Sequence, residues 1–157
     1  MLQELVSEII ALLLQDLPES FVFTLMIFSL AKIRYQAKPI IWIASLMALI
    51  NLIVRHLPIA FGVHTIILIF AYVALTWFFT KQLLSKIFLC VMITTACIVA
   101  AEAAYSIPLL NWVGMTYEEC YANPLLRAAF ALPGEIFVLL LALGINFYHK
   151  KRRNYDA

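Results

Sequence analysis

Two glutamates lie inside long apolar stretches of this 157-residue chain, where a carboxylate is costly. Glu102 belongs to the stretch "VAAEAAY" and Glu135 to the stretch "ALPGEIF". An ionisable group at the centre of a bilayer costs at least about 2.5 kcal/mol, so such groups usually serve a substrate or ion pathway or pair with one another. We therefore expect both carboxyl groups to face the interior of a helix bundle.

Three more polar residues could join them in one cavity. Asn51 and Arg55 end one apolar run, and His64 begins the next, with Pro58 and Gly62 marking a turn between the two runs. We expect a polar, ligand-binding cavity open to the outside, lined by Glu102, Glu135, Asn51, Arg55 and His64. The alternative is that the turn carries only interfacial residues and that each carboxyl group merely hydrogen-bonds to a neighbouring helix.

The composition identifies the setting of these residues. The chain is 65% hydrophobic and 13% charged, with a mean hydropathy of +0.97, whereas soluble domains are about half apolar and a quarter charged. Alternating apolar and polar residues of a β-barrel are absent. We predict an all-α integral membrane bundle, residues 1–157 forming a single membrane domain whose first partner is the lipid bilayer. The net charge of +2 does not indicate nucleic-acid binding.

Five apolar segments are each close to the roughly 20 residues that a membrane-spanning helix needs. The predicted spans cover residues 17–35, 39–56, 63–80, 83–107 and 124–148, and a basic tail follows at 149–157. Pro133 and Gly134 weaken the last span just before Glu135. Small residues surround Glu102 and allow another helix to come close, so we expect the fourth and fifth spans to pack together. These small residues are Ala100, Ala101, Ala103 and Ala104.

Residues 1–16 allow two interpretations. Polar residues recur every three or four positions and make this stretch amphipathic. It is either an interfacial helix on the outer face or the beginning of one long helix kinked near Pro18. In "DLPES" we expect Asp16 to be the N-cap of the first span, with Pro18 and Glu19 in its first turn.

The basic residues predict an orientation. Nine of the eleven Lys and Arg residues fall on one side of the five spans, and only Arg55 and Arg127 fall on the other. Because cytoplasmic loops carry the excess of Lys and Arg, we predict a multi-pass protein of the cytoplasmic membrane. Its N-terminus is outside and its C-terminus is cytoplasmic.

Catalytic and metal-binding patterns are missing. The sequence has no HExxH motif and no serine elbow, and its three histidines lie near span ends. The only Cys–His pairings that the predicted topology allows are Cys120 with His56 or His64, and Cys90 with His149. Three scattered cysteines make neither a disulfide framework nor a zinc site. We predict no enzyme activity, no catalytic or metal-ligating residue and no cofactor.

The stretch "LPIAFGVHTII" resembles a stretch of small bacterial membrane proteins. The membrane parts of those proteins are similar to the sensor regions of peptide-sensing (GHKL-type) histidine kinases of Gram-positive bacteria. The similarity extends to "MLQE" at the start, the glutamate in the fourth span and "NPLLRA" at the beginning of the last span. It implies a domain that detects an extracellular signal. The chain carries no phosphoacceptor helix or ATP-binding domain, so signalling would require a cytoplasmic or membrane partner, or a homo-oligomer.

Three functions are compatible with these residues. The first is a ligand-sensing or regulatory module that binds a small or peptide-like ligand from the outside. The second is a small transporter or transport subunit that uses Glu135 beside a broken helix as a proton or cation site. The third is a structural or assembly protein whose polar residues only hold helices together.

Overall fold

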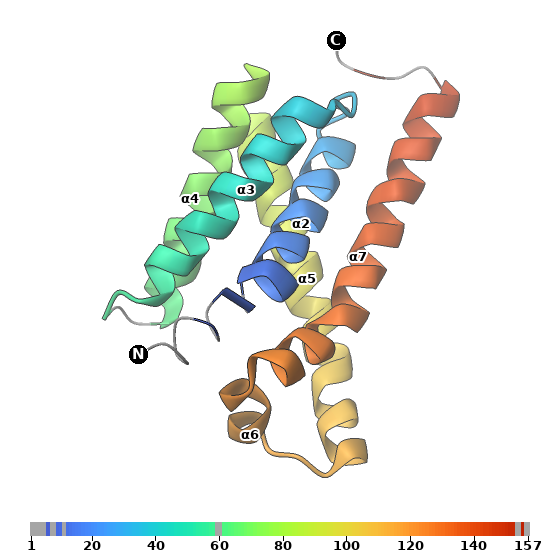
Figure 1. Ribbon diagram of the computed structural model, residues 1–157. Coiled ribbons are helices and arrows are strands. Elements are labelled where there is room, and N and C mark those ends of the chain that lie inside the picture. The colour runs from blue at the N-terminus through green and yellow to red at the C-terminus, as the bar shows by residue number, and fades with distance from the viewer. Residues whose placement is uncertain (1–5, 7–8, 11, 59–60, 153–154, 156–157) are drawn as a thin grey trace.

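The computed structural model describes residues 6, 9–10, 12–58, 61–152 and 155, and this part of the chain contains no strand. Five candidate spans are long and apolar enough to cross a membrane, as the sequence predicted. A short π-helix continues into the first of them (Figure 1). The elements are η1 (Leu12–Asp16), α2 (Leu17–Leu30), α3 (Ala37–Arg55), α4 (Phe61–Thr80), α5 (Leu84–Val113), α6 (Tyr117–Ala122) and α7 (Pro124–Arg152).

The first candidate span, Leu12–Leu30, is continuous helix. Residues 12–30 form η1 and α2 without interruption, and Pro18 lies in the first turn of α2, as expected. Asp16 occupies the N-cap position of α2, as predicted, but it does not cap the helix: its backbone is helical (φ −64°) and its side chain makes no capping hydrogen bond. The rest of the predicted amphipathic stretch lies largely outside the described residues.

Two helices are longer than predicted. Helix α5 continues past Pro108 to Val113, six residues beyond the expected end of that span. It ends at Gly114, whose φ of 71° is a left-handed conformation that glycine adopts without strain. Helix α7 continues through Pro133 to Arg152. The weakening expected at Pro133 and Gly134 therefore does not break the helix.

Helix α6 lies in a stretch for which no helix was expected. Thr116 caps it: the Thr116 hydroxyl accepts from the Glu119 backbone N–H at 3.4 Å, and the Glu119 carboxylate accepts from the Thr116 N–H at 2.9 Å. This reciprocal arrangement is a capping box. The pattern Thr-x-x-Glu was visible in the sequence and would have predicted the helix.

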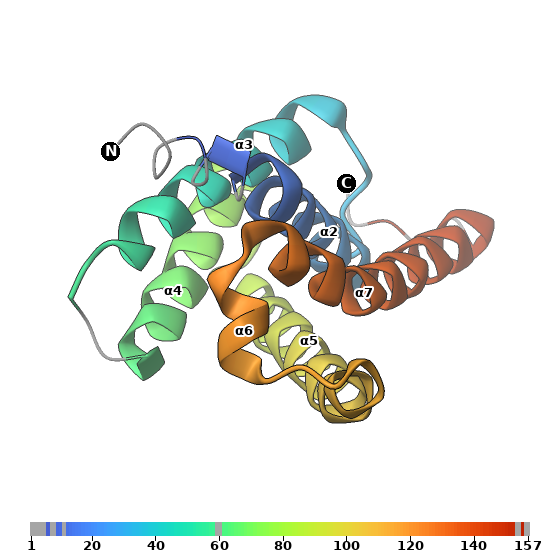
Figure 2. The same cartoon turned by 60° about the horizontal axis from the view of Figure 1, so that its bottom comes forward.

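The five long helices run up and down. Helix α2 contacts α3, α5 and α7, while α4 lies against α3 and α5 (Figures 1 and 2). This order brings the described Lys and Arg residues, except Arg55 and Arg127, to one end of the bundle, here called the basic end. The opposite end, which carries α6 and the α3–α4 connection, is here called the α6 end. The basic end holds Lys32, Arg34, Lys38, Lys81, Lys86, Lys150, Lys151 and Arg152.

The tightest packing lies toward the basic end. Phe28 of α2, Ile43 of α3, Ile87 of α5 and Val138 of α7 are all fully buried. Helices α2 and α7 are also joined there, since the Ser29 hydroxyl donates to the Ala142 carbonyl at 2.8 Å. Many large apolar side chains lie exposed on the outer faces of the helices, which is consistent with a lipid environment.

Candidate functional site

A cavity of about 590 Å³ lies in the half of the bundle toward the α6 end, lined by η1, α2, α3, α4 and α5 and by one residue of α7. Typical small-molecule sites measure about 300–1,000 Å³. Arg55, Leu57 and His64, at and beside the α3–α4 connection, line its outer part. Phe23 and Tyr72 line its inner part, where their rings stack with centroids 4.2 Å apart. The cavity is therefore polar toward the bundle end and apolar toward the core.

The structure brings four of the five predicted site residues to this cavity. Asn51, Arg55, His64 and Glu102 all line it. Glu135 does not, but it lines a neighbouring small pocket together with Glu102. Gln15, Glu19 and Arg127 also line the large cavity and were not among the predicted residues.

A chain of polar contacts begins at Asp16 and includes three residues that line the cavity, namely Asn51, Arg55 and His64. The Asp16 Oδ1 atom accepts from Arg55 Nη2 at 2.6 Å and from Asn51 Nδ2 at 3.0 Å. His64 Nε2 lies 3.2 Å from the Asn51 Oδ1 acceptor, which continues the chain to α4. The Asp16 side chain is fully buried, and its other carboxylate oxygen has no hydrogen-bond partner among the described residues. These contacts tie η1, α3 and α4 together.

The register of the first hairpin explains why Asp16 and Asn51 meet. Asp16 lies fourteen residues before the end of α2, and Asn51 lies fourteen residues after the start of α3. Because the two helices are antiparallel with a short connection, equal offsets place both residues at the same height. This count was available from the sequence, but it required the exact helix ends.

Three carboxyl groups border one small pocket beside the large cavity. The expectation that Glu102 faces the bundle interior is only partly met, because its side chain lines this pocket but is exposed. Glu19, Glu102 and Glu135 line a pocket of about 10 Å³, which is room for about one water molecule. Glu102 lies eleven residues before the end of α5, and Glu135 lies eleven residues after the start of α7. The two antiparallel helices therefore present both acids at one level, and α2 adds Glu19 from a third side.

Helices α5 and α7 pack together as predicted, but the predicted alanines do not make the contact. Ala100, Ala103 and Ala104 are exposed. Instead Tyr105 lies against Gly134, where a Cβ atom would be only 2.9 Å from the Tyr105 hydroxyl oxygen. Gly134 is thus the residue that allows the close approach, because a side chain there would collide with the tyrosine ring.

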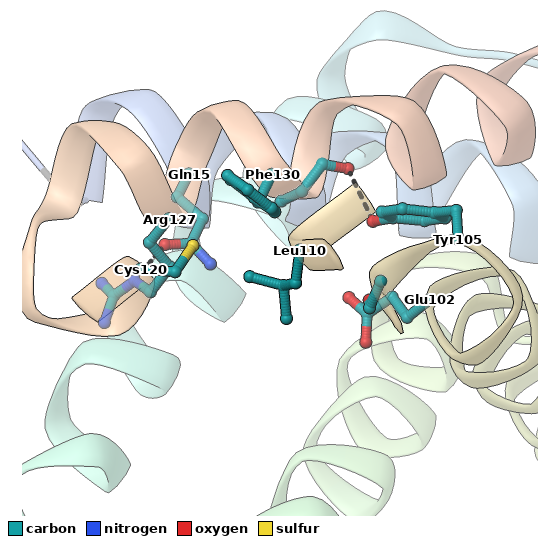
Figure 3. Close-up of a pocket in the computed structure, with 9 residues that line it drawn as sticks. Gln15, Glu102, Tyr105, Leu110, Cys120, Arg127 and Phe130 are labelled. Atoms are coloured by element: carbon teal, nitrogen blue, oxygen red, sulfur yellow. Dashed lines mark hydrogen bonds between the residues drawn. The ribbon is translucent and has the colours of Figure 1, made fainter. Parts of the chain in front are cut away.

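A third pocket, of about 40 Å³, lies between α5, α6 and α7 (Figure 3). Arg127 Nε donates to Gln15 Oε1 at 2.5 Å and so connects α7 to η1, while Tyr105 donates to the Ala131 carbonyl at 3.5 Å. Glu102 lies across from Arg127 in this view. Cys120 of α6 is 2% exposed, and burial raises the pKa of its thiol above the ordinary value.

The arrangement is suited to binding. A large cavity with one polar and one apolar half can hold a small molecule and orient it. Among the described residues, no three His, Cys, Asp or Glu side chains are grouped closely enough to hold a metal ion. No protein-family model, curated protein or solved structure matches the chain.

Proposed function

We propose that this chain is a small sensing or regulatory protein of the cytoplasmic membrane that binds a small ligand from the outside, in the cavity of about 590 Å³. The five apolar helices would span the bilayer, with the α6 end outside and the basic end in the cytoplasm. The cavity carries the proposal: it unites residues from all five candidate spans, and Arg55, Leu57 and His64 line it toward the α6 end.

The position of the core favours binding from one side over passage through the bundle. Met47 and Tyr72, which line the cavity, are buried. Beyond it, toward the basic end, fully buried side chains of α2, α3, α5 and α7 fill the interior. A site lined by Arg55, Leu57 and His64 toward the α6 end and bounded by a packed core toward the basic end suits a receptor.

The contacts of α2 and α7 suggest how binding would be communicated. Both helices contribute to the cavity, through Glu19 and Arg127. Both are also joined near the basic end, where Ser29 contacts the Ala142 carbonyl and the Tyr35 hydroxyl. A ligand that shifts either helix would therefore move the other at the end where a cytoplasmic partner would contact it. The resemblance to kinase sensor regions supports the same interpretation.

Transport is the second candidate, and the convergence of Glu19, Glu102 and Glu135 favours it. Three carboxyl groups that border one pocket could exchange a proton. The expected broken helix beside Glu135 is not observed, since α7 is continuous through Pro133. This removes one of the two features on which the transport hypothesis rested.

Cysteine accessibility distinguishes these functions. In a background in which Cys90, Cys97 and Cys120 are replaced by alanine, single cysteines are introduced at Thr65 and Thr95, which line the cavity. The matched control is Thr94→Cys, one residue away on the same helix but fully buried in the core. A membrane-impermeant maleimide is then applied to oriented vesicles from each side. A C-terminal fluorescent fusion establishes which side is cytoplasmic.

We expect labelling of Thr65→Cys and Thr95→Cys from the outside only, and no labelling of Thr94→Cys from either side. Labelling of Thr95→Cys from both sides would replace the sensor proposal with transport. Protection of both cavity cysteines from both sides would indicate a closed bundle and favour the structural or assembly function.

A further inference from the structure

The charged residues of the large cavity are not equally engaged. Arg55 donates to the buried Asp16 carboxylate, and Arg127 donates to Gln15, so each arginine already has an acceptor. Glu19 and Glu102 also line the cavity, and neither has a hydrogen bond or an ion pair within 4 Å to any described residue. Gln15 is uncharged, so Arg127 keeps its positive charge. With the Arg55–Asp16 pair set aside and the other groups ionised, two carboxylates face one guanidinium, and the described lining carries one net negative charge.

The two carboxylates come from different walls of the cavity. Glu19 belongs to the first turn of α2, and Glu102 to α5, and the two helices pack against each other. Both residues also line the small pocket that contains Glu135, so the two side chains lie close enough to share one pocket. A single cationic group placed at this edge of the cavity would be within reach of both.

The remaining wall is suited to an organic group. Phe23 and Tyr72 stack with their ring planes only 14° apart, and Leu68, Ile69 and Ile98 extend the apolar surface around them. The faces of aromatic rings attract cations, and the rings and aliphatic chains accept hydrocarbon. A metal ion would use neither feature, whereas an alkyl or aryl amine would use both.

We propose that the cavity binds an amphipathic organic cation, with an ammonium group between Glu19 and Glu102 and an apolar body against Phe23 and Tyr72. This inference depends on the proposed function, because it requires the cavity to be a ligand site. The ammonium group belongs either to a free amine or to an amine-bearing lipid headgroup, which share the same recognition chemistry.

The test is a series of probes with one hydrocarbon chain and different head groups. Hexylamine, hexyltrimethylammonium, hexanol and hexanoate are titrated by calorimetry into the full-length protein in maltoside micelles. We expect the two cations to bind at least tenfold more tightly than hexanol and hexanoate, because charge-assisted hydrogen bonds and ring contacts act only on the cations. This comparison uses the unaltered protein and so does not depend on any variant folding.

Charge-neutral variants locate the site. Glu19→Gln and Glu102→Gln should each weaken hexylamine binding at least tenfold. The matched control is Glu118→Gln, an exposed acid on α6 that lines none of the three cavities described here, and it should leave the affinity unchanged. Elution as a single species and an unchanged melting temperature without probe show that each variant folds. Competition by added phosphatidylethanolamine would identify the lipid source, and its absence would identify a free amine.

Tighter binding of hexanoate than of hexylamine, weakened by Arg127→Gln, would overturn the inference and leave the cavity as a site for anions. Equal binding of all four probes, or binding of none, would overturn it too. The proposed function fails by a different result, namely cavity cysteines that are protected from both sides of the membrane.

Discussion

Replacing Arg55 with methionine removes the cationic partner of a fully buried carboxylate. The Asp16 Oδ1 atom accepts from both Arg55 and Asn51, and its second oxygen has no partner among the described residues. Methionine retains an apolar stem of similar length, so the change removes the charge and the hydrogen bond while leaving little empty space. Asp16 is then left with Asn51 as its only described donor.

The structure sets the size of the effect. Removing one partner of a buried ion pair costs about 3–5 kcal/mol, because the other charge stays buried without compensation. The Arg55 side chain is 30% exposed and the hydrogen bond from Asn51 to Asp16 survives, so we expect a loss of stability at the lower end of this range. A loss of about 3 kcal/mol changes the unfolding equilibrium constant roughly 150-fold. In Asp16→Asn/Arg55→Met the buried charge is gone, and we expect about 2 kcal/mol of this loss to be recovered.

Unfolding in mixed micelles of maltoside and dodecyl sulfate, followed by the fluorescence of Trp42, Trp77 and Trp112, measures these differences. Arg34→Met is the matched control, because it removes an exposed arginine at the basic end. The reasoning is refuted if Arg55→Met costs no more than Arg34→Met. It is also refuted if the losses of the two single variants simply add in the double variant.

Two further predictions concern helix packing and capping. Gly134→Ala should destabilise the protein by about 1–3 kcal/mol in the same unfolding assay, because its Cβ would meet Tyr105. The control Gly144→Ala has open space around it and should be neutral or mildly stabilising. Equal effects of the two substitutions would contradict the packing of α5 on α7. The backbone N–H of Thr116 holds the pKa of Glu119 below its ordinary value of 4.5. Capping by this carboxylate should therefore be present above pH 4.5 and lost as the pH falls through the lowered pKa. Above pH 4.5, hydrogen exchange over α6 should be slower in the wild type than in Glu119→Ala, and the difference should disappear once the carboxylate is protonated. A difference that persists at every pH would show that the ionised carboxylate is not what caps α6.

The helices and their polarity were predictable from the sequence because both are local properties. An apolar stretch of about twenty residues predicts a spanning helix wherever it occurs, so five candidate spans followed from the chain alone. The basic residues then gathered at one end because consecutive helices alternate in direction. The turn at Pro58 between α3 and α4 was also predictable. The packing of α5 on α7 was predicted from the alanines around Glu102, but Tyr105 and Gly134 make the close contact instead.

The composition of the site was only partly predictable. Asn51, Arg55, His64 and Glu102 line the large cavity as expected, and Glu135 lines the adjoining pocket instead. Asp16 and Glu19 looked like ordinary residues of a helix start, where acids favour the helix dipole. Their true partners are far away in sequence, and nothing in the local pattern of "DLPES" identifies Arg55 or Glu102 as neighbours.

The sequence by itself determined that this chain is a bundle of apolar helices with one basic end, and that several acids lie within the apolar helices. Only the tertiary structure decided which of those acids meet. Helix register and rotation set the neighbours of each side chain, and both depend on packing between distant segments, such as Tyr105 against Gly134. That packing places Glu19, Glu102 and Glu135 around one pocket and leaves a cavity of about 590 Å³ beside it.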